Sequence, residues 1–284
     1  MKILFLTPQL PYPPQKGTAL RNWGLISGLA EHHWVSLLSF QAPGQDPQPA
    51  PELAAACARV DTVPQPERAL RDRLRDMLIT RQPDMALRLA SEPFARQLEN
   101  WLARESFDVI HIEGIELAPY LDVIEAARPR PLVLFDDHNC EYLLQKRVYL
   151  TDLRAPARWP GAAYSFVQWR RLLRYEAHVC RRADYVLAVS EPDAAALQKL
   201  APELDVVVIP NGIDTRAYRL PMNQSPMTND QIPNPQISKS PTLVFTGTMD
   251  FRPNVDAVLW FARKALPLVR AEVADAHFVI VGQR

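Results

Sequence analysis

Six short apolar segments alternate with longer amphipathic stretches in the first three quarters of the chain. The segments are residues 3–7, 35–40, 109–113, 132–135, 185–190 and 206–209. Most are apolar at consecutive positions, which is typical of strands buried on both faces of a parallel sheet. The stretches between them predict helices, among them 18–31 with Thr18 as N-cap, and 191–200, where Ser190 and Asp193 have capping-box spacing. Strands alternating with helices predict an α/β fold with a doubly wound parallel sheet.

The composition changes after residue 220. Residues 221–241 contain five prolines with many Ser, Asn and Gln, which predicts a linker. Residues 242–284 then restart the pattern as strand, helix and strand. One such unit rarely buries enough apolar surface to form a domain. We therefore expect a complete domain at 1–220, a linker at 221–241, and the first βαβ unit of an incomplete second domain at 242–284.

Charge and cysteine usage restrict the partners and the compartment. Lys and Arg number 32, as do Asp and Glu, so no overall field attracts nucleic acid, and no nucleic-acid partner is expected. The three cysteines are far apart and form no CxxC pair, which indicates a reducing, cytoplasmic location. The apolar run near the N-terminus is too short for a secretory signal, and no run is long enough to span a bilayer.

The loop before the first predicted helix is a candidate phosphate site. It reads PPQKGTALR at 13–21 and follows the first strand, at the edge where α/β sheets bind ligands. Gly17 would let the backbone approach a phosphate at the helix N-terminus, and Lys16 and Arg21 add positive charge. The loop matches neither GxGxxG nor the P-loop, which disfavours an NAD-dependent oxidoreductase and an NTPase. An ordinary loop is the alternative interpretation.

Polar residues also follow two other strands. Asp136 to Asn139 come directly after 132–135, and His138 could bind a substrate hydroxyl or transfer a proton. The alternative is helix capping by an Asp or Asn. His111 and Glu113 share one face of their strand, where they either line the same site or are ordinary strand-end residues. No second ligand cluster supports a metal site.

Two further loops carry weaker signals. Asn211-Gly212 after the sixth strand is a turn signal. Between the two strands of 242–284, Gly247 permits close approach of a ligand, and Arg252 could pair with a phosphate.

The stretch 166–182, FVQWRRLLRYEAHVCRR, predicts a basic helix. An apolar stripe is formed by Phe166, Trp169, Leu173, Ala177 and Cys180, and five arginines lie largely off it. The arginines either contact anionic lipid or a phosphorylated acceptor, or they are a solvated helix face.

Five motifs in order resemble the bacterial family 4 glycosyltransferases of GT-B fold, especially the sugar transferases of exopolysaccharide gene clusters. They are PYPPQKGTALR, FDDHNCEY, ADYVLAVSEPDAAAL, VIPNGID and FTGTMDFRPNVDAVLWFA. The resemblance implies two Rossmann-like domains, the first binding the acceptor and the second most of a nucleotide-sugar donor. It also implies transfer with retention, without a metal or other cofactor.

The resemblance assigns roles to particular positions. His138 matches the histidine close to the donor sugar and is the candidate catalytic residue. The candidate substrate- and donor-binding residues are Gly17, Thr18, Arg21, Glu113, Asn139, Asn211, Gly247 and Arg252. Many family members have Gly-Gly where this chain has Gly17-Thr18, and the match of Arg252 to a phosphate-binding arginine is loose.

The expected function is transfer of a hexose from a nucleotide sugar to a glycan or lipid-linked acceptor in polysaccharide biosynthesis, with peripheral contact to the inner membrane. The family's E-x7-E motif would lie beyond residue 284, so this polypeptide alone is expected to be inactive. The alternative is a catalytically inactive relative that binds a glycan or a partner. The donor sugar, base and acceptor are not specified by these motifs.

Overall fold

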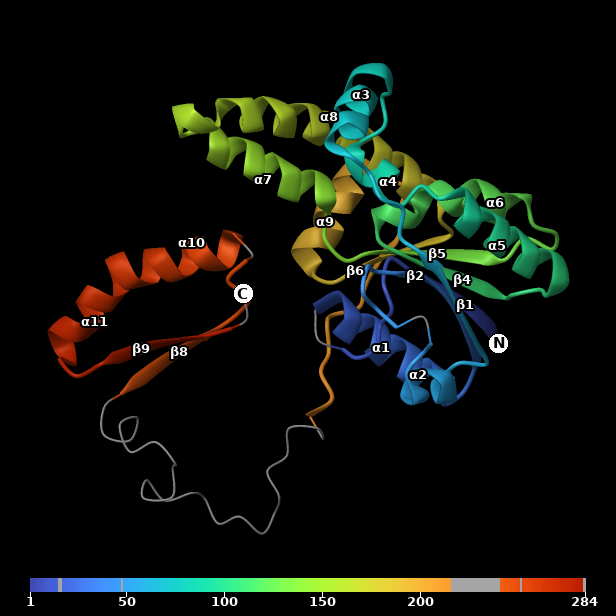
Figure 1. Ribbon diagram of the computed structural model, residues 1–284, viewed down its shortest axis with the longest axis horizontal. Coiled ribbons are helices and arrows are strands. Elements are labelled where there is room, and N and C mark those ends of the chain that lie inside the picture. Colours follow the sequence, from blue (N-terminus) through green and yellow to red (C-terminus); the bar gives the residue numbers. More distant parts are fainter. Residues whose placement is uncertain (15–16, 47, 216–240, 251, 283–284) are drawn as a thin grey trace, which may run out of the picture. The chain divides into compact units, whose positions relative to one another are not determined.

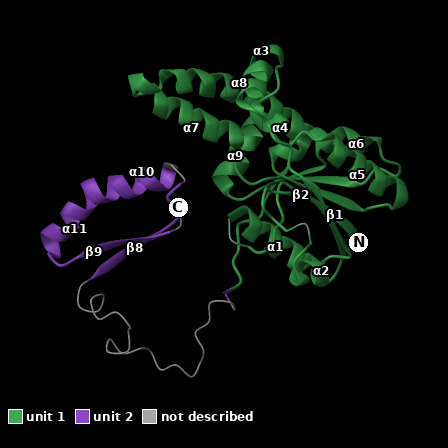
Figure 2. Ribbon diagram, in the orientation of Figure 1, with its two compact units in different colours: residues 1–214 green, residues 215–284 purple. Residues whose placement is uncertain are grey.

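The computed structural model describes residues 1–14, 17–46, 48–215, 241–250 and 252–282. The chain divides into two compact units, residues 1–214 and 215–284 (Figure 2). Most of the predicted linker, residues 221–240, lies outside the described residues, as does Lys16. The two units are described separately below.

The first unit is built on a seven-stranded parallel sheet with the order β3-β2-β1-β4-β5-β6-β7 (Figure 1). Its strands are β1 (Lys2–Thr7), β2 (Trp34–Gln41), β3 (Arg59–Pro64), β4 (Val109–Glu113), β5 (Leu132–Asp137), β6 (Tyr185–Ala188) and β7 (Val206–Val208). The six predicted strands are therefore confirmed, with small shifts at their ends. One shift matters for the site: Asp136 and Asp137 are the last residues of β5, not loop residues after it.

Helices connect successive strands. They are α1 (Gly17–Ala30), α2 (Pro51–Ala56), α3 (Leu70–Ile79), α4 (Asp84–Arg88), α5 (Glu92–Arg104), α6 (Leu121–Ala126), α7 (Glu141–Leu153), α8 (Trp159–Arg182) and α9 (Glu191–Leu200), with the 3₁₀ helices η1 (Ile115–Tyr120) and η2 (Pro156–Arg158). The prediction for α9 is confirmed, because Ser190 Oγ accepts a hydrogen bond from the Asp193 amide at 3.3 Å. The prediction for Thr18 is wrong: α1 already begins at Gly17, so Thr18 lies inside its first turn.

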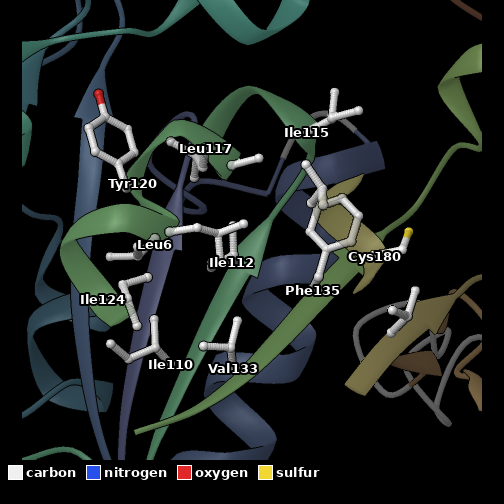
Figure 3. Packing of buried hydrophobic residues seen from close by; sticks show 14 of the residues in the cluster. Leu6, Ile110, Ile112, Ile115, Leu117, Tyr120, Ile124, Val133, Phe135 and Cys180 are labelled. Carbon is white, nitrogen blue, oxygen red and sulfur yellow. The ribbon is translucent and has the colours of Figure 1, made fainter. Parts of the chain in front are cut away.

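Two apolar layers sandwich the sheet. Leu4 and Leu6 of β1 pack with residues of α5, α8 and η1, whereas Ile3 and Phe5 pack with residues of α1 and α2. Figure 3 shows the first layer, where Leu6, Ile110, Ile112, Val133 and Phe135 lie together. Successive residues of β1 therefore enter opposite layers, as expected of a strand covered on both faces.

The strand β3, which the sequence did not predict, lies at the edge of the sheet. Its sequence, RVDTVP, mixes charged and apolar residues, and only Val63 is buried. An edge strand needs no continuous apolar run, because it is not enclosed on both sides by other strands. Its sequence therefore lacks the signal by which the other six strands were predicted.

The helix α8 is longer than predicted, and its apolar stripe is confirmed except at one end: Ala177 and Cys180 are buried, and Trp169 and Leu173 pack against the core. Its buried residues include Ser165, Gln168 and Glu176, whereas Phe166 of the predicted apolar stripe is 43% exposed. The correction has a physical reason: α8 runs antiparallel to α7 in an arm that extends beyond the sheet (Figure 1), so Phe166 packs against Tyr149 of α7, with ring centroids 5.3 Å apart. In the described parts of the chain, no helix is both long enough and apolar enough to cross a membrane.

The second unit pairs β8 (Thr242–Thr246) with β9 (His277–Val281) in parallel. The connection consists of α10 (Arg252–Trp260), a π-helical turn (η5, Phe261–Ala265) and α11 (Leu266–Glu272). The predicted strand–helix–strand order is therefore confirmed.

Candidate active site

The candidate site lies at the carboxyl ends of β1, β4 and β5. The connections run outward from β1 to β2 and β3, and then return to the other side of β1 with β4. A sheet of this kind has its ligand crevice where the strand order reverses, at the carboxyl ends of the strands. Glu113 ends β4, Asp137 ends β5, and α1 supplies Arg21 and Asn22 close to both strands.

His138 is the first residue after β5 and is partly accessible, with 18% of its side chain exposed. Its Nδ1 lies 3.3 Å from Oε1 of Glu113, at the end of the neighbouring strand. Burial lowers the pKa of His138, although the negative charges of Asp136 and Glu116 oppose the effect. The imidazole is therefore held largely in its neutral form near pH 7.

Gly114 forms a close contact beside His138. Its backbone has φ +79° and ψ 157°, a combination that is accessible essentially to glycine alone. A Cβ atom here would lie 3.5 Å from Cε1 of His138 and 3.0 Å from Oε2 of Glu116. Because residue 114 is a glycine, no side chain stands between the end of β4 and the imidazole of His138.

Glu113 is completely buried and pairs with α1. Nδ2 of Asn22 donates a hydrogen bond to its Oε2. Burial raises the pKa of Glu113 well above its usual range; the Asn22 hydrogen bond opposes this, and the charges of Asp136 and Glu116 add to it. The neutral carboxylic acid is therefore the favoured form of Glu113.

Arg21 and Asp136 form a buried ion pair near Glu113. Nε and Nη2 of Arg21 donate to the two carboxylate oxygens of Asp136 at 2.9 and 3.0 Å. Nη1 donates to the carbonyl of Ile209 and to Oδ1 of Asn211. Arg21 therefore ties α1 to β5 and to the segment after β7.

The pKa of Asp136 reflects opposing effects. Burial alone would raise it, but His111 and Arg21 together hold it below its usual range. Nε2 of His111 lies 3.4 Å from Oδ2 of Asp136, and its ring stacks on Phe5 with centroids 4.4 Å apart. Arg21 and His111 therefore favour the ionised form of Asp136, whereas burial favours the protonated form of Glu113.

Capping of the helix after His138 comes from a distant residue. The predicted alternative, capping of α7 by an Asp or Asn of this segment, is wrong: the N-cap is Cys140, whose side chain makes no cap hydrogen bond. Instead the buried carboxylate of Glu176 in α8 accepts hydrogen bonds from the amides of Glu141 and Tyr142, at 2.7 and 2.8 Å. The antiparallel packing of α7 on α8 supplies this cap, which no local sequence motif could indicate.

Burial keeps several more acids near this helix terminus protonated at unusually high pH. It raises the pKa of Glu176 to about 7 and that of Glu141 to about 8, and it raises the pKa of Asp137 well above its usual range. Asp137 and Glu176 also share a hydrogen bond. The described residues include no group of three or more His, Cys, Asp or Glu arranged to hold a metal ion.

Comparison with known proteins identifies the family. The sequence model of Glycosyltransferase Family 4 matches residues 16–217. The chain belongs to glycosyltransferase family 4. A comparison with curated proteins gave no match.

Solved structures share the fold of this family 4 glycosyltransferase. UGT71G1 of Medicago truncatula, complexed with UDP-glucose, has a TM-score of 0.54 at 12% identity, with 100% of this chain and 66% of that chain covered. The apo structure of OtsA has a TM-score of 0.56 at 11% identity, with 99% and 65% covered. The chain thus spans just under two thirds of the length of these proteins. The likeness shows the expected α/β fold of GT-B type.

The predicted site residues of the family 4 chain fall into three groups. Arg21, Glu113, His138 and Asn211 belong to the connected network of the first unit. Gly17, Thr18 and Asn139 make no side-chain contact that links them to it; Gly17 and Asn139 are exposed. Their predicted roles in donor binding stay predictions.

Gly247 lies in the second unit, directly after β8. Its amide donates to the carbonyl of Val281 at 3.0 Å, and an added Cβ would lie 2.7 Å from Nδ2 of Asn254. Asn254 in turn donates to the Thr248 carbonyl, which fixes this turn. Arg252 begins α10, and its side chain lies outside the described residues.

Sequence analysis missed three residues of the network: Asn22, Glu116 and Glu176. Asn22 directly follows the predicted Arg21, and a polar residue on the inner side of α1 is the only signal that could have marked it. Glu116 follows the glycine that ends β4, and Glu176 sits within a helix whose predicted apolar stripe did not include it. Neither position carries a local motif.

Proposed function

We propose that the protein transfers a hexose from a nucleotide-sugar donor to a glycan or lipid-linked acceptor, with retention of configuration, in polysaccharide biosynthesis. Family membership supports a glycosyltransferase, and a protein of similar fold is complexed with UDP-glucose. The observation that carries the proposal is the position of His138, partly accessible at the carboxyl ends of the central strands and backed by buried acids. The nucleotide sugar acts as substrate, and neither a metal nor another cofactor is part of the proposal.

In this reaction the bond between the anomeric carbon and the diphosphate oxygen breaks. The anomeric carbon bonds to the acceptor oxygen, and the acceptor proton leaves with the diphosphate or to solvent. Positive charge develops on the sugar ring and negative charge on the leaving phosphate. A neutral His138 can orient a sugar hydroxyl or donate a hydrogen bond to an oxygen on which charge develops, and this contribution grows as the bond breaks.

Replacement of His138 tests this proposal. In a form of the protein with a complete donor-binding domain, we expect His138→Ala to lower kcat by ~10²–10³, the usual cost of one donor in an enclosed site. The measurement is release of nucleoside diphosphate from a panel of nucleotide sugars, with the anomeric configuration of the product determined by NMR. Asn139→Ala is the matched control, because Asn139 is adjacent and exposed.

The outcomes separate the candidate functions. A folded His138→Ala protein with unchanged kcat contradicts the catalytic role of His138. Binding of a nucleotide sugar or glycan without any turnover, by a form of the protein with a complete donor-binding domain, favours the alternative, a binding module. A product of inverted anomeric configuration contradicts only the proposed retention and leaves the transferase function supported.

A basic pocket supports a phosphorylated acceptor at the membrane surface. Its volume is 680 Å³, and its lining residues are Arg81, Gln82, Arg171, Arg174, Tyr175 and His178. None of the described residues that line it is acidic. Arg171 is held in place because its guanidinium donates to the carbonyls of Met77 and Gln82. The pocket therefore presents fixed positive charge to a phosphate group.

Other arginines of α8 differ in their surroundings: some pair with acidic residues of the fold, and one is exposed in the pocket. Arg181 pairs with Glu203, and Arg182 pairs with Asp122 and Glu125, so these two hold the fold together. Arg174 is exposed in the pocket. At the other end of α8, the arm of α7 and α8 exposes apolar side chains, among them Trp159 at 57%. We include contact with an anionic membrane surface in the proposal for this reason.

Vesicle binding tests the pocket. We expect Arg174→Glu to reduce co-sedimentation with phosphatidylglycerol vesicles several-fold, because charge near an anionic surface contributes about 1 kcal/mol per residue. Arg96→Glu on α5 is the control, since Arg96 is also exposed and lies outside the pocket. Equal binding to phosphatidylcholine vesicles, or equal loss in both variants, would contradict a specific role of the pocket.

A further inference from the structure

Asn22, Glu113 and His138 form a buried row from α1 through the end of β4 to the residue after β5. Nδ2 of Asn22 donates to Oε2 of Glu113, and Oε1 of Glu113 lies 3.3 Å from Nδ1 of His138. Among the described residues, Oε1 of Glu113 and Nδ1 of His138 are both shut off from solvent, and neither atom has a hydrogen-bond partner, although they lie 3.3 Å apart. A proton placed between these two atoms would satisfy both of them, while the imidazole also hydrogen-bonds the backbone of Asp136.

The positions of the hydrogens follow from this row. The Asn22 amide occupies Oε2 as a donor, so Oε2 acts as the acceptor oxygen of Glu113. If Glu113 carries a proton, that proton lies on Oε1, directed at Nδ1 of His138. A neutral imidazole that accepts at Nδ1 carries its own proton on Nε2.

We propose that Glu113 is a positioning residue that donates a hydrogen bond from Oε1 to Nδ1 of His138 and so fixes the imidazole as the Nε2–H tautomer. Glu113 then acts through His138 and does not itself touch the substrate. Its complete burial agrees with this role. Nε2–H is left as the donor for a sugar or phosphate oxygen, which is the part of the inference that rests on the proposed function.

The charges around the pair agree with two neutral partners. Burial favours the neutral forms of both Glu113 and His138. Asp136 of β5 and Glu116 of η1 are negative charges near both groups, and Arg21 of α1 is the positive charge near both. Among the described residues, Arg21 is the cation near Glu113, and its guanidinium is already paired with Asp136.

The tautomer can be read in the wild-type protein without any substrate. Long-range ¹H–¹⁵N correlation spectra of protein with ¹⁵N-labelled histidine distinguish a protonated from an unprotonated ring nitrogen. We expect His138 to show a protonated Nε2 and an unprotonated Nδ1 at pH 7. A protonated Nδ1 would overturn the inference, because Glu113 would then be an ionised acceptor.

Two substitutions of Glu113 separate positioning from simple packing. In Glu113→Gln the amide can still donate to Nδ1, so we expect the Nε2–H tautomer and most of the activity to remain. In Glu113→Leu we expect a mixture of tautomers and a fall in kcat of about 10²-fold with little change in KM. Glu116→Gln is the control, since Glu116 is near the pair and does not face Nδ1; it should keep the wild-type tautomer.

The results distinguish failure of this inference from failure of the proposed function. The Nε2–H tautomer in a protein that transfers no sugar would support the positioning role and contradict the transferase. Full activity and an unchanged tautomer in folded Glu113→Leu would overturn the positioning role. If Glu113→Leu does not fold, the spectra of the wild-type protein and of Glu113→Gln still test whether His138 is the Nε2–H tautomer.

Discussion

At the residue scale, the site depends on single atoms at the ends of two strands. Gly114 and His138 come from neighbouring strands and meet because Glu113 pairs with Asp136 in the register of β4 and β5. The amide of Gly114 also donates to the carbonyl of Asp136 at 3.1 Å, which extends this pairing beyond β4. The geometry around the imidazole is thus fixed by backbone as well as by side chains.

We expect Gly114→Ala to lower the free energy of unfolding by about 1–3 kcal/mol, the cost of holding a residue with a Cβ in this backbone region. It should also reduce turnover, because the new methyl group approaches both Glu116 and His138. Urea unfolding and steady-state kinetics measure the two effects.

Gly28→Ala is the matched control for this prediction. Gly28 lies in α1, and a Cβ there would meet nothing within 4 Å. Alanine inside a helix is more favourable than glycine by roughly 1 kcal/mol, so this variant should be more stable than wild type. Equal stability of the two variants would contradict the conformational role of Gly114.

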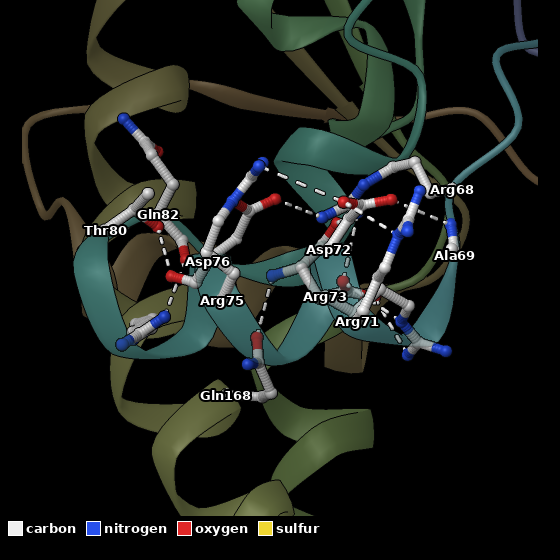
Figure 4. Close-up of polar contacts among 12 residues, drawn as sticks. Arg68, Ala69, Arg71, Asp72, Arg73, Arg75, Asp76, Thr80, Gln82 and Gln168 are labelled. Atoms are coloured by element: carbon white, nitrogen blue, oxygen red, sulfur yellow. Dashed lines mark hydrogen bonds and ion pairs between the residues drawn. The ribbon is translucent and has the colours of Figure 1, made fainter.

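At the element scale, α3 differs from the other helices of the first unit in how it is held. None of its residues is buried, and Leu78 is 81% exposed. Ion pairs connect it to its surroundings instead: Arg68 pairs with Asp76 and Asp84, and Arg73 pairs with Asp84 (Figure 4). The amide of Asp84 donates in turn to Oε1 of the buried Gln168 in α8, at 2.8 Å.

We expect salt to loosen α3 selectively. Raising the ionic strength from 0.1 to 1 M shortens the screening length from about 10 to 3 Å, which weakens partly exposed ion pairs. Hydrogen exchange of the α3 amides should therefore become faster at high salt. The helix α5 is the internal control, because it buries Phe94, Leu98 and Trp101. A parallel change in both helices would show that the ion pairs do not hold α3.

At the scale of the whole molecule, the buried acids link stability to pH. The pKa values of Glu113, Asp137, Glu141 and Glu176 are all raised, mainly by burial. The folded protein therefore keeps protons that the unfolded chain releases above about pH 4.5. Each such proton lowers the free energy of unfolding by about 1.4 kcal/mol per pH unit as the pH rises between the two pKa values.

We expect the protein to be less stable at pH 8 than at pH 6. The decline should run from about pH 5 to the region of the raised pKa values, about 7 for Glu176 and about 8 for Glu141. His138 acts in the opposite sense: its lowered pKa removes stability as the pH falls below about 6.5. Urea unfolding at a series of pH values measures the profile.

Glu176→Gln should flatten this profile, because the variant removes one of the retained protons. Glu99→Gln on the exposed side of α5 should leave it unchanged. Stability that rises steadily from pH 5 to pH 8 would contradict the prediction.

The sequence by itself determined the class of fold and the positions of six of the seven strands of the first unit. That information is local, because a strand enclosed on both faces is apolar at most of its positions, as residues 3–6 of β1 are. Local spacing also located Ser190 as the N-cap of α9. The order of motifs indicated the family that the sequence model then identified.

Only the tertiary structure decided which polar residues meet. Arg21 pairs with Asp136 across 115 positions, Asn22 with Glu113 across 91, and Glu176 caps a helix that begins 35 positions earlier. These partners are chosen by the order of strands in the sheet and by the packing of α7 on α8. The neutral state of Glu113 likewise follows from the burial that the assembled layers impose, since the free energy of a charge depends on everything around it and not on its neighbours in the chain.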